Sequence, residues 1–334
     1  MRMNIVLTVP GIAIPHGGIR VILEWANWLS QNHDVTLFCR KGVSAPTWMS
    51  ISPEVKIISN ERHIKKNSVL VICSPHDIDL IDDVNMPEKK FIFLQMLEHL
   101  FRPGSREWVA KCAKTYSCKV PLFSISQWNI DYIKKYYFKG HRDIYYIGNG
   151  VNSSTFSIDS RCKKDVKCVL VEGWENGNNP TKDVDAIGPQ VAQKLRDSGY
   201  RILAYSQYPI QRNTFTPHEY YFRPSTTMLN NLYSRATVLI KASKYDARAC
   251  SPMEAMTKGC VTARGIIKGD DDLIHDENCL RNDYSDMDGL YESALRILTD
   301  TVLRDRLKAN CIDYVRKYSW GYWMPQVEGI LAHD

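Results

Sequence analysis

Short apolar runs alternate with longer segments of helical periodicity along the whole chain. The first run, at 3–9, precedes a segment at 19–31 where apolar residues recur every three or four positions, which predicts an amphipathic helix. Further strands are predicted at 34–39, 55–58, 69–73, 91–95, 121–125, 144–147, 167–172, 201–205, 237–241 and 260–263, and further helices at 105–118, 126–137, 182–198, 251–258, 286–298 and 301–317. This alternation favours parallel sheets covered by helices on both faces.

The length of the chain and a break near its midpoint predict two such sheets. A chain of 334 residues is too long for one ordinary domain and suits two of roughly 150 residues each. The polar segment Asn149–Ser154 interrupts the alternation near the middle. We therefore expect two doubly wound α/β domains, at 1–152 and 153–318. Ligands bind such sheets at the carboxyl ends of the strands, so two facing sheets suit a transfer between two bound molecules.

The composition excludes several classes of protein. Hydrophobic residues make up 44% of the chain and charged residues 24%, which is a globular profile and not a disordered one. No apolar run approaches the roughly 20 residues that span a bilayer, and the first run is too short for a secretory signal, so export is not expected. Ten cysteines contain no Cys-x-x-Cys pair and no metal-ligand spacing, and several lie in apolar strands. We expect reduced thiols in a cytoplasmic protein, with no metal site.

The excess of positive over negative charge lies in the first half of the chain. The net charge is +6, and residues 1–150 hold 19 Lys and Arg against 13 Asp and Glu, whereas the remainder holds 24 of each. Something anionic is expected to approach this half. The segment Tyr132–Arg142 mixes basic and aromatic residues, as single-strand nucleic-acid binders do. It equally suits a face on an anionic membrane, or a partly buried helix with a solvated basic edge.

Two helix starts are candidate binding sites. Gly17 and Gly18 open the first predicted helix, where backbone N–H groups can approach an anion or a sugar, although the pair also fits a plain turn. In the second half, Ser251 is expected to cap a helix that begins at Pro252, with Glu254 completing a capping box. The same geometry would leave the amides of 252–254, Met253 among them, free for a phosphate, with the Glu254 carboxylate able to accept sugar hydroxyls.

The segment around this helix resembles a known family. Asp246 and Glu254 are eight residues apart, similar to the acidic-x7-Glu motif of the family 4 glycosyltransferases of the GT-B fold, and Ala255–Cys260 resembles the continuation of that motif. Further resemblances follow in the family's order along the chain, at 123–128, 147–152 and 303–320. The resemblance implies two Rossmann-like domains that face a central cleft, with a terminal helix at about 319–334 that packs on the first domain.

The resemblance also implies roles for individual residues of the second half. Glu254 takes the role of the residue that holds the nucleotide ribose, and Ser251, Pro252 and Met253 lie beside the same nucleotide. Asp246 takes the position near the donor sugar, where the family usually has the longer glutamate.

The loop that the family uses for the diphosphate differs in this chain. Gly173 and Lys182 match that loop, but Trp174 replaces the family's arginine. Arg248 is the nearest candidate in sequence for the missing cation, although an exposed loop arginine needs no special role.

Candidate acceptor-side residues come from the first half. The segment 93–105, followed by Thr115 and Tyr116, resembles a subgroup that transfers rhamnose onto cell-surface polysaccharides. This resemblance assigns Gln95 and Glu98 to the acceptor side, whereas Glu98 also fits a solvated strand end. His76 matches loosely a histidine that many family members direct at the donor sugar, and it also fits an ordinary loop residue.

The resemblance implies a retaining transfer from a nucleoside-diphosphate sugar. The reaction needs the leaving phosphate stabilised, which helix amides, Lys182 and Arg248 could supply, so no cofactor or essential metal is expected. The expected acceptor is anionic or presented on an anionic surface, a lipid-linked glycan first and a nucleic acid second, in the cytoplasm or at the inner face of the membrane. The alternatives are a glycosyltransferase acting on DNA bases, a nucleic-acid-binding protein, and a GT-B epimerase or phosphorylase, the last without a cofactor-lysine signature.

Overall fold

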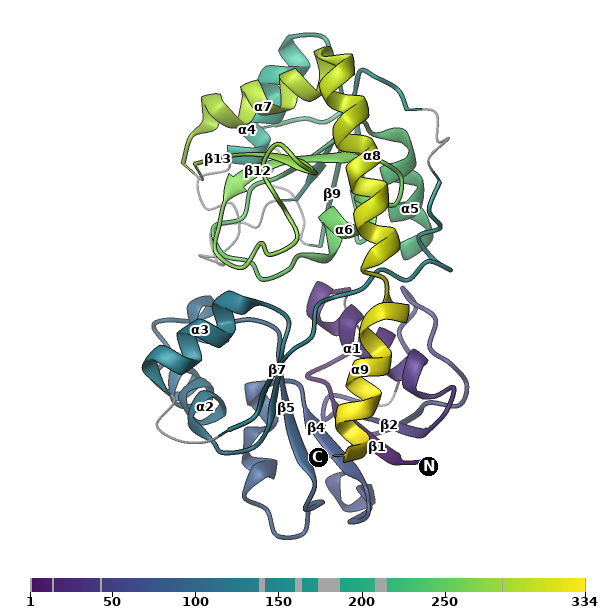
Figure 1. Cartoon of the computed structure of the whole chain (residues 1–334), viewed down its shortest axis with the longest axis vertical. Helices are drawn as coiled ribbons and strands as arrows, with labels where there is room; N and C mark the ends of the chain where they lie inside the picture. The colour runs from purple at the N-terminus through teal and green to yellow at the C-terminus, as the bar shows by residue number, and fades with distance from the viewer. Residues whose placement is uncertain are drawn as a thin grey trace. The chain divides into compact units, whose positions relative to one another are not determined.

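The computed structural model describes residues 2–13, 15–42, 44–137, 142–159, 164–173, 187–207, 215–283 and 285–333. The chain divides into two compact units. Unit 1 consists of Met1–Asn149 together with Gly321–Asp334, and unit 2 of Gly150–Trp320. The sequence analysis placed its boundary at residue 152. Each unit contains one parallel sheet, as Figure 1 shows, so the predicted α/β class with two Rossmann-like domains is confirmed.

The sheet of unit 1 has seven parallel strands in the order β3-β2-β1-β4-β5-β6-β7. The strands are β1 (Asn4–Thr8), β2 (Asp34–Phe38), β3 (Lys56–Ile58), β4 (Val69–Ile72), β5 (Lys90–Leu94), β6 (Leu122–Ser124) and β7 (Ile144–Tyr146). The chain builds outward from β1 to β3 and then returns to β4 on the other side of β1. The switch point where ligands bind such sheets therefore lies at the carboxyl ends of β1 and β4.

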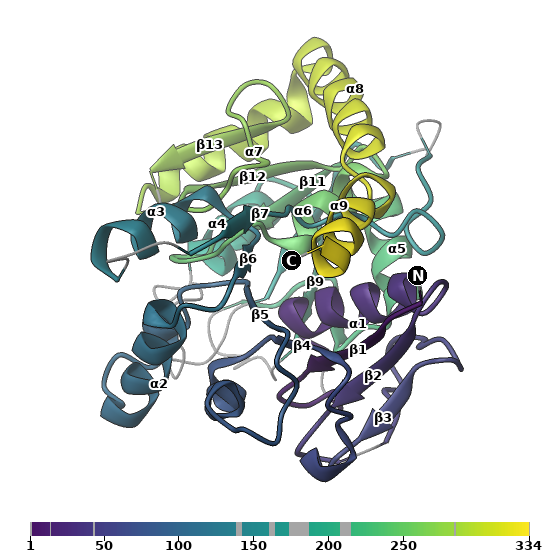
Figure 2. The ribbon, with the colours of Figure 1, turned by 60° about the horizontal axis from the view of Figure 1, so that its bottom comes forward.

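The helices of unit 1 bury one apolar face each. They are α1 (Gly17–Leu29), α2 (Arg106–Ser117), α3 (Gln127–Tyr136) and α9 (Trp320–His333), with short 3-10 helices η1 (Glu61–His63), η2 (Pro75–Ile81) and η3 (Glu98–Phe101). Figure 2 shows α1 beside β1 and β2. Trp25 of α1 is buried, with its ring stacked on Phe93 of β5 at 4.1 Å between centroids. The last helix belongs to unit 1, where Glu328 pairs with the imidazole of His33 at 2.9 Å.

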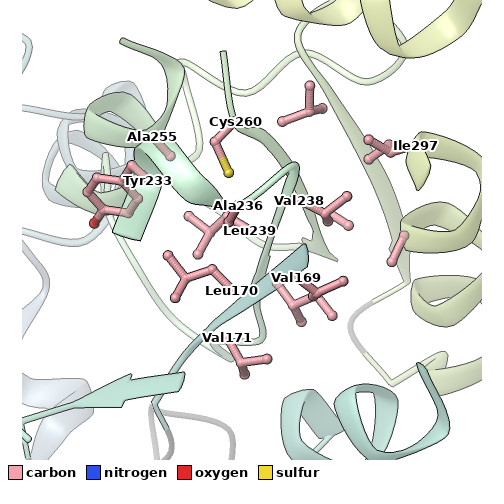
Figure 3. Packing of buried hydrophobic residues seen from close by; sticks show 14 of the residues in the cluster. Val169, Leu170, Val171, Tyr233, Ala236, Val238, Leu239, Ala255, Cys260 and Ile297 are labelled. Carbon is pink, nitrogen blue, oxygen red and sulfur yellow. The ribbon is translucent and has the colours of Figure 1, made fainter. Parts of the chain in front are cut away.

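The sheet of unit 2 has six parallel strands in the order β10-β9-β8-β11-β12-β13. The strands are β8 (Cys168–Glu172), β9 (Arg201–Ser206), β10 (Glu219–Phe222), β11 (Val238–Lys241), β12 (Val261–Ile266) and β13 (Cys279–Asp283). The helices are α4 (Ile187–Asp197), α5 (Thr226–Arg235), α6 (Cys250–Met256), α7 (Met287–Thr299) and α8 (Thr301–Lys317). Figure 3 shows the buried side chains of β8 and β11 between Ala255 of α6 on one side and Ile297 of α7 on the other.

Three elements of unit 2 were not predicted. Strand β10 is an edge strand whose residues are alternately half-buried and exposed, so no apolar run marks it. Strand β13 begins with two buried residues and ends exposed. Helix α5 contains threonine and asparagine, which have modest helix propensity, and it forms because Ser225 caps it and Leu229, Leu232 and Tyr233 are buried. Burial in the tertiary structure, and not local propensity, specifies these elements.

The two ends of unit 2 are in backbone contact. A Cβ added to Gly150, the first residue of the unit, would lie 2.4 Å from the backbone nitrogen of Trp320, the last. No side chain fits in that space, so the chain requires a glycine at this position.

The cysteines are mostly in the cores. Nine of them lie in the described ranges, and all nine are free thiols. Seven are buried, whereas Cys118 and Cys250 are partly exposed. Burial raises the pKa of the Cys73 and Cys279 thiols, the latter to about 12. These side chains behave as small apolar residues. None of the helices in the described ranges has the length and hydropathy that crossing a bilayer requires.

Candidate functional site

A buried lysine lies at the carboxyl end of β11, one of the two central strands of unit 2. Lys241 is the last residue of β11, and its side chain is 4% exposed. Its Nζ donates to Oε2 of Glu172, the last residue of the neighbouring β8, at 2.7 Å and lies 3.4 Å from Oδ2 of Asp246. A buried ammonium group between two carboxylates balances part of their charge. The predicted donor-sugar residue Asp246 therefore lies in an ion network at the carboxyl edge of the sheet.

Glu254 lies in the same region, at the end of a chain of hydroxyl groups. Its carboxylate is buried and accepts a hydrogen bond from Tyr233 at 3.2 Å between Oη and Oε2. Because Tyr233 donates its one hydroxyl hydrogen to Glu254, the hydroxyl of Tyr205, 3.2 Å away, donates to Tyr233. Burial first, and then the nearby carboxylates, raise the pKa of both tyrosines well above the ordinary value. Both phenols therefore stay protonated and able to donate.

Helix α6 starts differently from the sequence expectation. It begins at Cys250 with Ala249 as the N-cap residue, which makes no side-chain capping bond. The Ser251 hydroxyl instead donates to Oε2 of Glu172. The predicted capping box is therefore wrong, and Glu254 has Tyr233 as its partner in place of the helix end. The prediction that the amides of 252–254 bind a phosphate also needs correction. The helix begins two residues earlier, at Cys250, and Pro252 has no N–H to donate.

Arg248 is held away from solvent by an acidic partner. Arg248 is 3% exposed, and its backbone φ is +48°. Its Nε donates to Oδ2 of Asp272 at 2.5 Å, and its Nη2 pairs with the other carboxylate oxygen. Burial raises the pKa of Asp272, and the Arg248 charge opposes that rise. In this arrangement the guanidinium fork faces Asp272, so contact with a diphosphate would require it to leave this pair.

A second buried cation lies beside Lys241 and was not predicted. Arg264 of β12 pairs with Lys241 in the register of the parallel strands, and its side chain is fully buried. Its Nη1 lies 3.1 Å from Oδ1 of Asp270. Burial raises the pKa of Asp270 to about 7, against the opposing charge of Arg264. The carboxyl edge of unit 2 therefore contains two adjacent cations, each with carboxylates close to it.

Two residues of the predicted diphosphate loop, Trp174 and Lys182, lie outside the described ranges. Gly173, which precedes them, lies against the end of β9. A Cβ at Gly173 would lie 2.3 Å from the Cβ of Ser206, and the Gly173 amide donates to the Tyr205 carbonyl at 2.6 Å. The structure thus gives this glycine a packing role.

In unit 1, Gly17 and Gly18 open α1 as expected, but neighbouring side chains already bind this helix start. The Gly18 amide donates to Nδ1 of His16, the N-cap residue, at 3.2 Å. Gln95 donates from Nε2 to the Gly18 carbonyl at 3.0 Å, and a Cβ on Gly18 would meet Gln95 at 3.3 Å. Gln95, assigned to the acceptor side by resemblance, therefore anchors α1 to the end of β5.

His76 and Glu98 both contact Trp108 of α2. The His76 ring lies 4.5 Å from the Trp108 ring between centroids, and Trp108 Nε1 donates to the Glu98 carbonyl at 2.9 Å. The Arg102 guanidinium lies over the same indole at 5.4 Å. Burial raises the pKa of Glu98 to about 8, opposed by Arg102. Desolvation, followed by the charges of Arg102 and Lys41, lowers the pKa of His76. At neutral pH the imidazole is therefore neutral and Glu98 largely protonated.

The basic segment 132–142 has a buried side and an exposed side. Ile133 of α3 is buried, while Lys134 and Lys135 are exposed. Arg142 donates a hydrogen bond to the Val120 carbonyl at 2.5 Å, so its side chain stabilises the backbone that precedes β6. Residues 138–141, Lys139 among them, lie outside the described ranges. Across the part of the chain that the structure describes, no group of three or more His, Cys, Asp or Glu residues is arranged to hold a metal ion.

Comparisons with known proteins show the fold. No protein-family model and no curated protein sequence matches this chain. Among solved structures, sucrose-phosphate synthase from Thermosynechococcus elongatus matches with a TM-score of 0.74 at 14% identity, covering 99% of this chain and 98% of that one. WaaG, a glycosyltransferase involved in lipopolysaccharide biosynthesis, matches with a TM-score of 0.71 at 15% identity, covering 99% and 100%. The chain has the GT-B fold.

A third solved structure of similar fold was determined with both a nucleotide sugar and DNA. An alpha-glucosyltransferase in complex with UDP-glucose and DNA containing an abasic site matches with a TM-score of 0.66 at 14% identity, covering 99% of both chains. At such identities the likeness extends to the GT-B fold alone.

Lys241, Glu172 and Arg264 were missed by the sequence analysis. The signal that could have found them is a charged residue in or directly after an otherwise apolar strand, since such a residue needs a partner when it is buried.

Proposed function

We propose that this protein is a retaining glycosyltransferase that moves a sugar from a nucleoside-diphosphate sugar to an acceptor hydroxyl in glycan or polysaccharide synthesis. The observation that carries the proposal is the pair of carboxylates Asp246 and Glu254, eight residues apart, which lie near one sheet edge of unit 2 in a chain of the GT-B fold. Carboxylates so placed suit the hydroxyl groups of a ribose and a sugar.

In the proposed mechanism unit 2 binds the donor. Glu254 accepts hydrogen bonds from the ribose hydroxyl groups, and the hydrogen bond from Tyr233 fixes the orientation of its carboxylate. Asp246 accepts hydrogen bonds from hydroxyl groups of the sugar, and the Lys241 ammonium balances the charge of the Asp246 carboxylate. The leaving diphosphate needs positive charge more than the attacking hydroxyl needs a strong base. Lys182, together with the backbone amides at the start of α6, supplies that charge, which is the work a metal ion does in other transferases.

Unit 1 binds the acceptor in this proposal. His76, neutral at physiological pH, can accept or donate a hydrogen bond at the reacting hydroxyl groups. Glu98 contacts the same tryptophan, Trp108, as His76 does. We further propose that the acceptor is anionic or presented on an anionic surface, because unit 1 is the more positive of the two units. Unit 1 has 19 Lys and Arg against 15 Asp and Glu, a charge of +4, whereas unit 2 has 24 against 22, a charge of +2. A lipid-linked glycan fits best, with the enzyme in the cytoplasm at the inner face of the membrane.

The donor assignment is tested by binding of nucleoside diphosphates. A panel of these compounds is added to the wild type and to Glu254→Gln, and the melting temperature and Kd are measured. The substitution keeps the size of the side chain and an oxygen for Tyr233 but removes the charge that binds ribose hydroxyls. We expect at least about tenfold weaker nucleotide binding and a loss of only about 1 kcal/mol of stability. Tyr233→Phe is a second test variant, since it keeps the charge of the Glu254 carboxylate but removes the hydrogen bond that orients it, and it should weaken nucleotide binding less than Glu254→Gln. A variant that melts far lower yet binds nucleotide normally would refute the ribose role.

Transfer to DNA is the second candidate, favoured by the neighbour solved with DNA. Flotation with anionic liposomes and pull-down with single-stranded DNA, each over a range of salt, separate the two. Replacing Lys134, Lys135 and Lys139 by Gln should weaken the association in whichever assay reports the native partner. If this variant associates normally with both liposomes and DNA, the basic segment is only a solvated helix face.

A further inference from the structure

Positive charges without acidic partners lie near His76 in unit 1. The charges that lower the pKa of His76 are those of Arg102, Lys41 and Lys111. Of these, Lys111 lies 3.4 Å from Glu107 in the preceding turn of α2. Arg102 and Lys41 have no carboxylate within ion-pair distance anywhere in the described ranges, and both are exposed.

Two cations close to these residues in the sequence are paired with carboxylates. Arg40, next to Lys41, donates to Asp77 at 2.9 Å and pairs with Glu61 at the same distance. Lys114, two turns along α2 from Arg106, pairs with Asp79 at 3.2 Å and Asp82 at 2.8 Å. Lys41 and Arg102 therefore differ from these two neighbours. They also differ from surface lysines that are unpaired in the described part of the chain, such as Lys65 and Lys66, in that the charges of Lys41 and Arg102 act on His76 at the end of β4.

The two cations converge on the switch point of the sheet. Lys41 follows β2, and its side chain packs 3.5 Å from the position of a Cβ on Gly11, which follows β1. His76 follows β4, and Arg102 follows β5 and lies over Trp108. All four strands are parallel neighbours, so these side chains come from one edge, where a doubly wound sheet binds its ligand.

We propose that Lys41 and Arg102 bind a phosphate or carboxylate group carried by the acceptor, next to its reacting hydroxyl at His76. This rests on the proposed function and assigns the anion recognition to the carboxyl edge of the sheet instead of to the lysines of the basic segment 132–142. An arginine fork suits the planar arrangement of oxygens on such a group.

The surrounding carboxyl groups do not oppose this anion. Glu98, the nearest acid on the Arg102 side, is largely protonated at neutral pH because burial raises its pKa to about 8. Asp77, beside His76, is buried and bonded to Arg40, so its charge is balanced. The Arg102 guanidinium lies over the face of the Trp108 indole, and this contact leaves the N–H groups of Arg102 available.

The experiment uses inorganic phosphate as the probe and the imidazole signals of His76 as the reporter. The full-length protein is titrated with phosphate and followed by NMR, with Arg102→Gln and Lys41→Gln as test variants. Lys114→Gln is the matched control, since it removes one positive charge from a paired cation on α2. We expect phosphate to raise the pH at which His76 titrates in the wild type and the control, and each test variant to bind phosphate about tenfold more weakly.

A second arm separates the acceptor from the donor. With the protein saturated with UDP, the phosphate response of His76 should persist, and UDP affinity should be the same in Arg102→Gln as in the wild type. Loss of the phosphate response on adding UDP, or loss of UDP affinity in the variant, would assign these cations to the donor diphosphate and overturn the proposal. Equal phosphate binding in all variants would also overturn it. If no nucleoside diphosphate of the panel binds, the donor assignment fails, while the phosphate titration still decides the anion site.

Discussion

Replacing Lys241 by methionine tests the ion network at the carboxyl edge of unit 2. Lys241 is 4% exposed and lies 2.7 Å from Glu172 and 3.4 Å from Asp246. At an effective dielectric constant of about 20, these distances give gross attractions of about 6 and about 5 kcal/mol, most of which offsets the cost of burying the ammonium group. Methionine fills a similar volume and leaves the two carboxylates facing each other.

The net loss should be about 3 kcal/mol or more, because an uncompensated charge remains partly buried. For a unit of about 170 residues this lowers the Tm by roughly 6–12 °C. The loss should depend on pH. In the variant the folded unit holds a proton on one of the two crowded carboxylates more tightly than the unfolded chain does, so stability falls as the pH rises. The Tm deficit should therefore be smaller at about pH 5 than at about pH 8.

The assay is thermal unfolding of both proteins across this range of pH. Lys194→Met is the matched control, since Lys194 also pairs with a carboxylate at 2.8 Å but is 47% exposed, and its Tm should hardly change. Lys241→Arg should recover most of the lost stability. A Tm deficit in Lys241→Met that equals the control's, or that is the same at every pH, would show that Lys241 does not hold these carboxylates together.

Three further predictions concern other positions. Burial raises the pKa of Glu98 from 4.5 to about 8, so stability falls as the pH rises between these values, and Glu98→Gln should raise the Tm at pH 8 more than at pH 5. A Cβ on Gly150 would lie 2.4 Å from the Trp320 nitrogen, so thermal melts should show Gly150→Ala destabilised by about 1–3 kcal/mol, whereas Gly104→Ala, with open space around it, should melt like the wild type. Asp270→Asn should cost about 3–5 kcal/mol in denaturant unfolding at pH 8, where the Asp270 carboxyl group is ionised, because it leaves a fully buried arginine without its carboxylate.

The strands with continuous apolar runs could be predicted because they are buried on both faces. Residues 169–171 of β8 and 238–240 of β11 are fully buried, and each run stands out from the polar segments around it. The edge strand β10 could not be found this way, since its half-exposed residues follow no apolar run.

The site could be predicted only where a local motif marks it. The spacing of Asp246 and Glu254 is visible in the sequence, but Lys241 and its partner Glu172 are 69 residues apart and meet only through the pairing of β8 with β11. The capping box failed for the same reason, because Ser251 prefers the distant Glu172 to its own helix. Long-range partners depend on strand order, which local patterns do not specify.

The distribution of thiols gives the protein a built-in set of chemical labels. Seven of the described cysteines are buried, so an alkylating reagent reaches them only when the surrounding core opens. Of the two partly exposed thiols, Cys118 lies at the end of α2 in unit 1, and Cys250 is the first residue of α6, next to Ser251. Mass-spectrometric footprinting can therefore read each unit separately, and protection of Cys250 by a bound nucleotide would report occupancy of unit 2 before any sugar or acceptor is identified.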